Sequence, residues 1–138
     1  MEQYGERDLC QVTGLLNMMQ FMRLASVHLQ DPLAEPLTFL YFDIENFKSF
    51  NQRYGFQQGN RLLRYVADLL REIFEGDLVA RLNDDHFAVA TQSGNAGDCI
   101  QFIHERVRVY DMGLPMEVKA GIYCPPQGVT DVALIMDR

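Results

Sequence analysis

Residues 37–51 read LTFLYFDIENFKSFN, and this stretch decides the fold. Its first six residues are almost wholly apolar, which is typical of a central strand covered on both faces. The strand ends in Asp43-Ile44-Glu45. A short helix is predicted over residues 46–54, with Asn46 as its candidate cap and Gly55 suited to the left-handed position after its end. The stretch therefore indicates a buried strand that feeds directly into a helix.

Further helices and strands alternate around this unit. Apolar residues at helical spacing predict helices at residues 15–29, 60–74 and 98–110, and Asn60 is the candidate cap of the second. Apolar or alternating runs predict strands at residues 78–82, 87–91 and 116–123. The first two of these strands form a hairpin around the turn Asn83-Asp84-Asp85-His86. A last helix starts near residue 130, so we expect one domain over residues 1–138 that is cut within its final helix. The expected fold class is α/β (α+β), a central mixed sheet flanked by helices.

Composition narrows the classes of function. The chain has 138 residues, 48% of them hydrophobic, which is enough for a core without disulfides. Its net charge of -7 argues against nonspecific binding of nucleic acid, although a mononucleotide carried with a divalent cation stays open. Three cysteines with no C-x-x-C spacing indicate reduced thiols in a cytoplasmic protein. No apolar run approaches the roughly 20 residues of a membrane span, and the polar first ten residues are unlike a signal peptide. We therefore expect no membrane contact.

Two acidic positions are candidates for a metal site. Asp43 follows the apolar strand, and ligands of α/β sheets gather at the carboxyl ends of strands. A carboxylate there suits a hard cation such as Mg²⁺, but it equally suits a simple turn. Asp84 or Asp85 in the hairpin turn could supply a second carboxylate, although a polar turn alone would explain them. The two positions together favour the metal site.

Other polar residues near these acids have two interpretations each. Lys48 could meet a phosphate as a point charge, or it is simply a solvated helix residue. Asn51 and Asn60 could read a base edge, although capping a helix is the commoner use of Asn60. His86 is adjacent to Asp85, but side chains alternate along a strand. With strand-like geometry in the turn, these two would point apart and could not share a metal.

These features occur in the order of a known family. The segment around Val12-Thr13-Gly14 resembles D-x-L-T-G-L-x-N, with Cys10 at the usual aspartate, and residues 42–51 resemble D-I-D-x-F-K-x-x-N. Residues 54–60 resemble F/Y-G-H-x-x-G-D, and residues 81–87 lie where R-x-G-G-D/E-E-F belongs, with the signature loop Asn83-Asp84-Asp85-His86-Phe87. From about Asp8 onward, the chain resembles the GGDEF family of diguanylate cyclases.

The resemblance implies a nucleotide site. Asp43, the backbone carbonyl of Ile44 and Asp85 would hold Mg²⁺ or Mn²⁺, which neutralises developing charge. Lys48 would contact the triphosphate, whereas Asn51 and Asn60 would face the guanine. In active members, two GTP-loaded domains meet face to face and form cyclic di-GMP and two pyrophosphates. A homodimer is therefore an implied partner.

Departures from the family pattern are concentrated in the same site. Asn83 and Asp84 replace the two glycines that let backbone approach a ligand closely, and Asp84 adds a negative charge. His86 replaces the second acid, and Asn60 replaces the aspartate that would accept both guanine N–H groups. Phe74 stands where the arginine of the product-inhibition motif R-x-x-D belongs. We therefore expect a degenerate domain that is catalytically weak or inactive, binds a nucleotide weakly or not at all, and acts as a nucleotide-binding or regulatory module for an attached EAL phosphodiesterase or sensor domain. The alternatives are a functional cyclase and a scaffold that binds no nucleotide.

Overall fold

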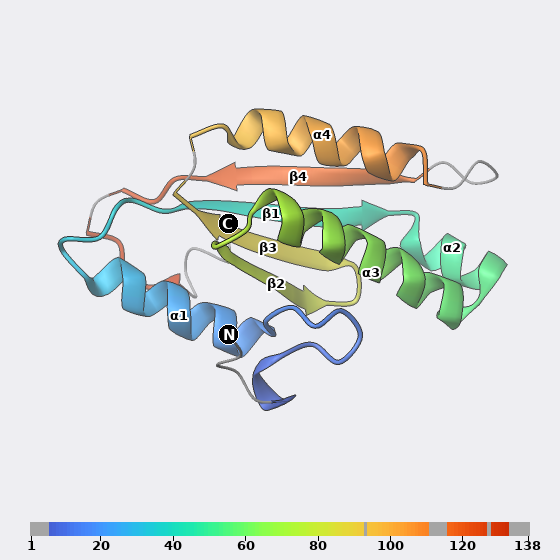
Figure 1. The fold of residues 1–138 in the computed structure, drawn as a ribbon, viewed down its shortest axis with the longest axis horizontal. Helices are drawn as coiled ribbons and strands as arrows, with labels where there is room; N and C mark the ends of the chain where they lie inside the picture. The colour runs from blue at the N-terminus through green and yellow to red at the C-terminus, as the bar shows by residue number, and fades with distance from the viewer. Residues whose placement is uncertain (1–5, 93, 111–115, 127, 133–138) are drawn as a thin grey trace.

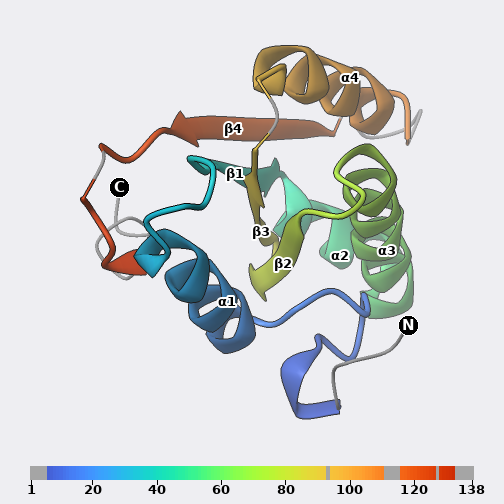
Figure 2. The ribbon, with the colours of Figure 1, turned by 60° about the vertical axis from the view of Figure 1, so that its left-hand side comes forward.

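A four-stranded sheet with helices on both faces makes up the domain (Figures 1 and 2), in a computed structural model that describes residues 6–92, 94–110, 116–126 and 128–132. The helical elements are η1 (Glu6–Asp8), α1 (Met18–Gln30), α2 (Phe47–Tyr54), α3 (Phe56–Ile73) and α4 (Ala96–Arg108). The strands are β1 (Thr38–Glu45), β2 (Leu78–Asn83), β3 (His86–Thr91) and β4 (Glu117–Tyr123). Their order in the sheet is β2-β3-β1-β4. This is the arrangement of two split β-α-β units, and it confirms an α/β fold with flanking helices.

The pairing of the strands corrects one expectation. We predicted a mixed sheet, but the three strand pairs, β2 with β3, β3 with β1 and β1 with β4, are all antiparallel. Among the described residues, the isolated bridge between Leu16 and Ala80 is the parallel contact. The crossover through α2 and α3 does return β2 parallel to β1. The hairpin then inserts β3 between them, so the two parallel strands never pair.

Strand β1 separates two layers of core, as its apolar sequence predicted. Leu40, Phe42 and Ile44 are buried in the cluster that α3 and α4 cover. Phe39 and Tyr41 pack into the other cluster, beneath α1. Each fully buried side chain of this size stabilises the fold by about 1.5–3 kcal/mol. Because the strand alternates, Asp43 emerges on the same face as Phe39 and Tyr41, just past the end of the apolar run.

The junction between α2 and α3 corrects two predicted caps. Asn46 occupies the N-cap position of α2 in the left-handed region (φ 63°), and its side chain makes no capping hydrogen bond. Gly55, at a positive φ of 91° as expected, both ends α2 and begins α3 at Phe56. Asn60 therefore lies inside α3 and is not its cap. The glycine turns the chain sharply enough that α3 needs no side-chain cap to begin.

The remaining boundaries shift by a few residues. Helix α1 begins at Met18, later than predicted, because the Oδ1 of Asn17 caps it by accepting from the Gln20 N–H at 2.9 Å. Most of the final helix that we predicted from residue 130 falls on residues 133–138, outside the described residues. Within the described part of the chain, every helix is too short or too polar to cross a bilayer.

Candidate functional site

The hairpin between β2 and β3 is braced so that its tip reaches the end of β1. Asp84 takes a positive φ of 29°, and the register shifts between Arg81 and Asn83, so that Asn83 stands opposite His86. The Arg81 guanidinium donates two hydrogen bonds to the Asp84 carbonyl, from Nε at 2.9 Å and from Nη2 at 2.7 Å. The Ile44 N–H of β1 donates to the Asp85 carbonyl at 3.1 Å. The turn is therefore tied to β2 through Arg81 and to β1, the strand that carries Asp43, through Ile44.

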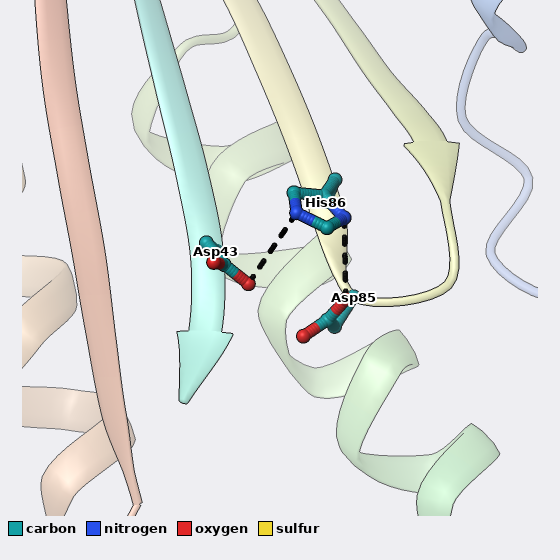
Figure 3. Close-up of side chains that lie close together, drawn as sticks. All are labelled: Asp43, Asp85 and His86. Atoms are coloured by element: carbon teal, nitrogen blue, oxygen red, sulfur yellow. Dashed lines mark ion pairs between the residues drawn. The ribbon is translucent and has the colours of Figure 1, made fainter. Parts of the chain in front are cut away.

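Three side chains converge at this point, as Figure 3 shows. Asp43 and His86 are register partners on β1 and β3, so their side chains share one face of the sheet. The His86 Nε2 lies 3.6 Å from Asp43 Oδ1, and its Nδ1 lies 3.2 Å from Asp85 Oδ1. One donor atom from each residue falls within 4.8 Å of the other two. The turn lacks the strand-like geometry under which Asp85 and His86 would point apart, because Asp84 takes a positive φ next to the register shift.

The electrostatics of this cluster favour a bound cation. Burial raises the pKa of the Asp85 carboxyl, and so do a hydrogen bond with Asp43 and the charge of Asp43. A hydrogen bond from the Asp85 backbone and the charge of His86 act in the opposite direction but do not outweigh them. Two ionised carboxylates in this position repel each other. A divalent cation between them would remove that repulsion.

The donor set fits a divalent cation. Carboxylate oxygens suit Mg²⁺ and Mn²⁺, and an imidazole nitrogen suits transition metals. Asp43 and Asp85 would be the ligands, with Ile44 bonded to the same turn. When bound, such an ion would neutralise the charge of a phosphate group placed beside it.

The other predicted site residues lie apart from this cluster, on the corner formed by α2 and α3. Lys48 is exposed on the first turn of α2. Asn60 is half-buried on α3. Among the described residues, no hydrogen bond or ion pair joins Lys48, Asn51 or Asn60 to the acidic cluster. The structure therefore brings together Asp43, Asp85 and His86, and places the predicted phosphate and guanine contacts on a separate element.

Asn51 is distinguished by an unpartnered acceptor. Its Oδ1 is buried and has no hydrogen-bond partner among the described residues. A Cβ added at Gly59 would lie 1.7 Å from this oxygen, so any larger residue at position 59 would force the Asn51 side chain to move. A buried acceptor without a donor costs stability, and a ligand N–H would satisfy it.

Two further contacts were not foreseen from the sequence. Cys10 accepts a hydrogen bond from Arg81 Nη1 at 3.4 Å. Burial would raise the pKa of the Cys10 thiol, but hydrogen bonds from Thr13 and Arg81 outweigh it and lower the pKa. Lys119 on β4 is the second register partner of Asp43, and its Nζ lies 3.9 Å from Glu45 Oε2. The Lys119 contact depends on strand register, and the Cys10 contact on how the segment before α1 packs against β2; the sequence pattern specifies neither.

The region of the product-inhibition motif is occupied by structural contacts. Phe74 is buried in the core with only 2% of its surface exposed. Asp77 accepts a hydrogen bond from the Thr91 hydroxyl at 2.7 Å. The retained acid therefore ties the ends of the β2–β3 hairpin together.

Comparison with known proteins decides the family. The family described as "Diguanylate cyclase, GGDEF domain" matches residues 8–138. The chain belongs to the GGDEF family. This GGDEF domain is 39% identical over 77 residues to the probable diguanylate cyclase DgcF of Escherichia coli K12, which covers 54% of this chain and 24% of that protein. It is 31% identical over 81 residues to the cyclic di-GMP phosphodiesterase NbdA of Pseudomonas aeruginosa, which covers 56% of this chain and 10% of that protein.

The fold of the GGDEF domain is shared as well. It superposes on the GGDEF domain of DgcB from Caulobacter crescentus, solved in complex with c-di-GMP, with a TM-score of 0.81. Sequence identity is 17%, and the match covers 99% of this chain and 85% of that one. The chain thus spans a quarter or less of the two curated relatives above, and it is a GGDEF domain of cyclic di-GMP signalling.

Proposed function

We propose that this GGDEF domain binds a divalent cation and, weakly, a guanine nucleotide, and that it regulates an attached domain instead of acting as an efficient cyclase. The observation that carries the proposal is the Asp43–Asp85 pair at a hairpin apex where Asn83 and Asp84 replace the two glycines of the family. The acid pair supports cation binding. The loss of the glycines opposes the binding of a triphosphate in reactive geometry.

Steric crowding and negative charge at the hairpin apex both oppose efficient catalysis. Asn83 and Asp84 stand at the apex, where the family has two glycines, and their side chains occupy space that a phosphate would need. Asp84 also brings a negative charge to the site. Asp84 is exposed, so water screens its charge, and two unit charges about 5 Å apart repel by about 0.8 kcal/mol in water. A triphosphate carries more than one charge, and each such contact would lower affinity by about fourfold.

The argument for residual nucleotide binding rests on the α2–α3 corner. Lys48 is exposed and available to a phosphate, and the buried Asn51 Oδ1 lacks a donor that a guanine N–H would provide. Asn60 offers one amide acceptor where two guanine donors need acceptors. With Asn60 in place of an aspartate, this corner would therefore select guanine less strongly.

Regulation of an attached domain is supported by the relatives. NbdA is a cyclic di-GMP phosphodiesterase, and the matched segment is 10% of its length, so the GGDEF-like segment is a small part of a longer phosphodiesterase. A GGDEF domain that retains cation and nucleotide contacts but turns over poorly would report nucleotide supply to an EAL phosphodiesterase or a sensor domain on the same chain or in a partner.

Two measurements test the proposal. The first incubates the protein with GTP and Mg²⁺ or Mn²⁺ and looks for cyclic di-GMP by chromatography. We expect at most trace product. Rapid turnover that disappears in Asp43→Ala and Asp85→Ala would establish the cyclase alternative, which the retained acid pair favours.

The second measurement titrates GTP, GDP and ATP by calorimetry in the presence of Mg²⁺. We expect weak binding with a small preference for guanine. No heat with any nucleotide would leave the non-binding scaffold as the better description. Asn51→Ala is the informative variant, because it removes the unpartnered acceptor and should abolish the guanine preference first.

A further inference from the structure

His86 and Asn83, two of the residues that depart from the family signature, are arranged like a metal-binding histidine and its supporting partner. The His86 Nδ1 lies 2.9 Å from the Asn83 Oδ1 and 3.2 Å from the Asp85 Oδ1. The Asn83 Oδ1 is an amide oxygen that can only accept, so this contact requires the proton on Nδ1. In the neutral ring, the lone pair then sits on Nε2.

The free nitrogen points at the acidic cluster. Nε2 lies 3.6 Å from Asp43 Oδ1. A lone pair that faces a carboxylate oxygen at this distance is unfavourable unless a proton or a cation lies between them. Ligands about 2.0–2.2 Å from a zinc ion at tetrahedral angles are about 3.3–3.6 Å apart, so the spacing between Nε2 and the Asp43 carboxylate suits a shared metal. The donor atoms of all three residues lie within 4.8 Å of one another. Histidine ligands almost always donate their other ring N–H to an oxygen, as His86 would to the Asn83 Oδ1.

We propose that His86 is a third protein ligand of this site, and that it shifts the preference of the site from Mg²⁺ to a first-row transition-metal dication such as Zn²⁺. Mg²⁺ favours six oxygen ligands and gives up its water reluctantly, whereas an imidazole nitrogen raises affinity along the series from Mn²⁺ toward Zn²⁺. Asn83 acts as a positioning residue for the ring. The inference uses the cation half of the proposed function and does not require nucleotide to bind.

The test is titration of the nucleotide-free protein with Zn²⁺, Mn²⁺ and Mg²⁺ in turn, followed by calorimetry. We expect Zn²⁺ to bind at least about tenfold more tightly than Mg²⁺. His86→Ala should lose about tenfold or more in Zn²⁺ affinity and leave Mg²⁺ affinity almost unchanged, since losing a ligand costs at least as much as losing its supporting partner. Asn83→Ala should lower Zn²⁺ affinity by a smaller factor than His86→Ala does. His86→Glu should narrow the preference for Zn²⁺ over Mg²⁺, because it restores an all-oxygen donor set.

Controls separate this site from adventitious binding. His104→Ala removes a histidine of α4 far along the chain from the cluster and should change nothing. Co²⁺ serves as a spectroscopic probe, and absence of thiolate-to-cobalt absorption would show that Cys10, Cys99 and Cys124 are not the ligands. His86 is about half exposed, so its variants should fold, and circular dichroism checks this.

Several results would overturn the inference. One is equal Zn²⁺ affinity of His86→Ala and His104→Ala, and another is tighter binding of Mg²⁺ than of Zn²⁺ to the unaltered protein. A thiolate signature with Co²⁺ would also do so. Failure of GTP to bind would remove the proposed nucleotide function but leave this inference standing, since its readout contains no nucleotide.

Discussion

Replacing Asp85 by asparagine should stabilise the domain in the absence of divalent cations at neutral pH. Donor atoms of Asp43 and Asp85 lie within 4.8 Å, and two unit charges at that distance repel by about 0.9 kcal/mol in water and about 3.5 kcal/mol at an effective dielectric constant of 20. The Asp43 side chain is 39% exposed and that of Asp85 22%, so solvent screening favours the lower value. We expect a gain of about 1 kcal/mol, or a few degrees in Tm.

The pH dependence follows from the direction of the pKa shift. The pKa of Asp85 in the folded domain is raised above its ordinary value of 3.8, chiefly by burial and then by Asp43. The folded state therefore holds this proton more tightly than the unfolded chain does. Stability of the unaltered domain falls as pH rises from 3.8 through the raised pKa. The advantage of Asp85→Asn should be absent below that window and complete above it.

Urea unfolding in EDTA, repeated across this pH range, is the assay. Asp84→Asn is the matched control, because it removes the same charge from the same turn and leaves the Asp43–Asp85 pair intact. Added divalent cation should stabilise the unaltered domain and Asp84→Asn, but not Asp85→Asn. The reasoning fails if, in EDTA at neutral pH, Asp85→Asn is no more stable than Asp84→Asn.

Three further predictions test other parts of the structure. Gly59→Ala should stabilise the Asn51→Ala background by about 1 kcal/mol in urea unfolding, through helix propensity, and should gain less in the unaltered domain, where the new Cβ meets Asn51. An equal gain in both backgrounds would contradict that contact. Asn60→Asp should raise GTP affinity by about tenfold in calorimetry, since a carboxylate accepts both guanine donors; unchanged affinity would argue against a guanine contact. Burial, and then the charge of Tyr123, raises the pKa of Tyr41 from 10.0 to about 12. The contribution of Tyr41 to the free energy of unfolding is therefore full below pH 10.0 and is lost as the pH rises through about 12. Tyr41→Phe should flatten this alkaline loss in thermal melts.

The parts of the fold that depend on hydrophobic periodicity were predictable from the sequence. The apolar run before Asp43 became β1, the central strand, and the stripe that includes Leu62, Val66 and Leu70 became the buried face of α3. Burial of such side chains dominates the free energy of folding, so their spacing alone indicates the element. The position of Asp43 at the end of β1 followed directly.

The parts that depend on backbone geometry at single residues were not predictable. The helix boundary at Phe56 follows from the positive φ of Gly55, and the left-handed Asn46 removes its own capping bond. The approach of His86 to Asp85 needs the unusual φ of Asp84 and the register shift beside it. Asn and Asp tolerate such angles but do not require them, so the sequence leaves several turn geometries open.

The segment around Leu16 pairs with part of the outer edge of strand β2. The Leu16 N–H donates to the Val79 carbonyl at 3.3 Å, and the Arg81 N–H donates to the Leu16 carbonyl at 3.0 Å, so strand β2 is already covered there. Among the described residues, β2 and β4 are the outer strands, and this segment interrupts the edge of β2 at Val79 and Arg81. An interrupted edge offers another chain fewer consecutive backbone partners, which disfavours edge-to-edge pairing with a further molecule there.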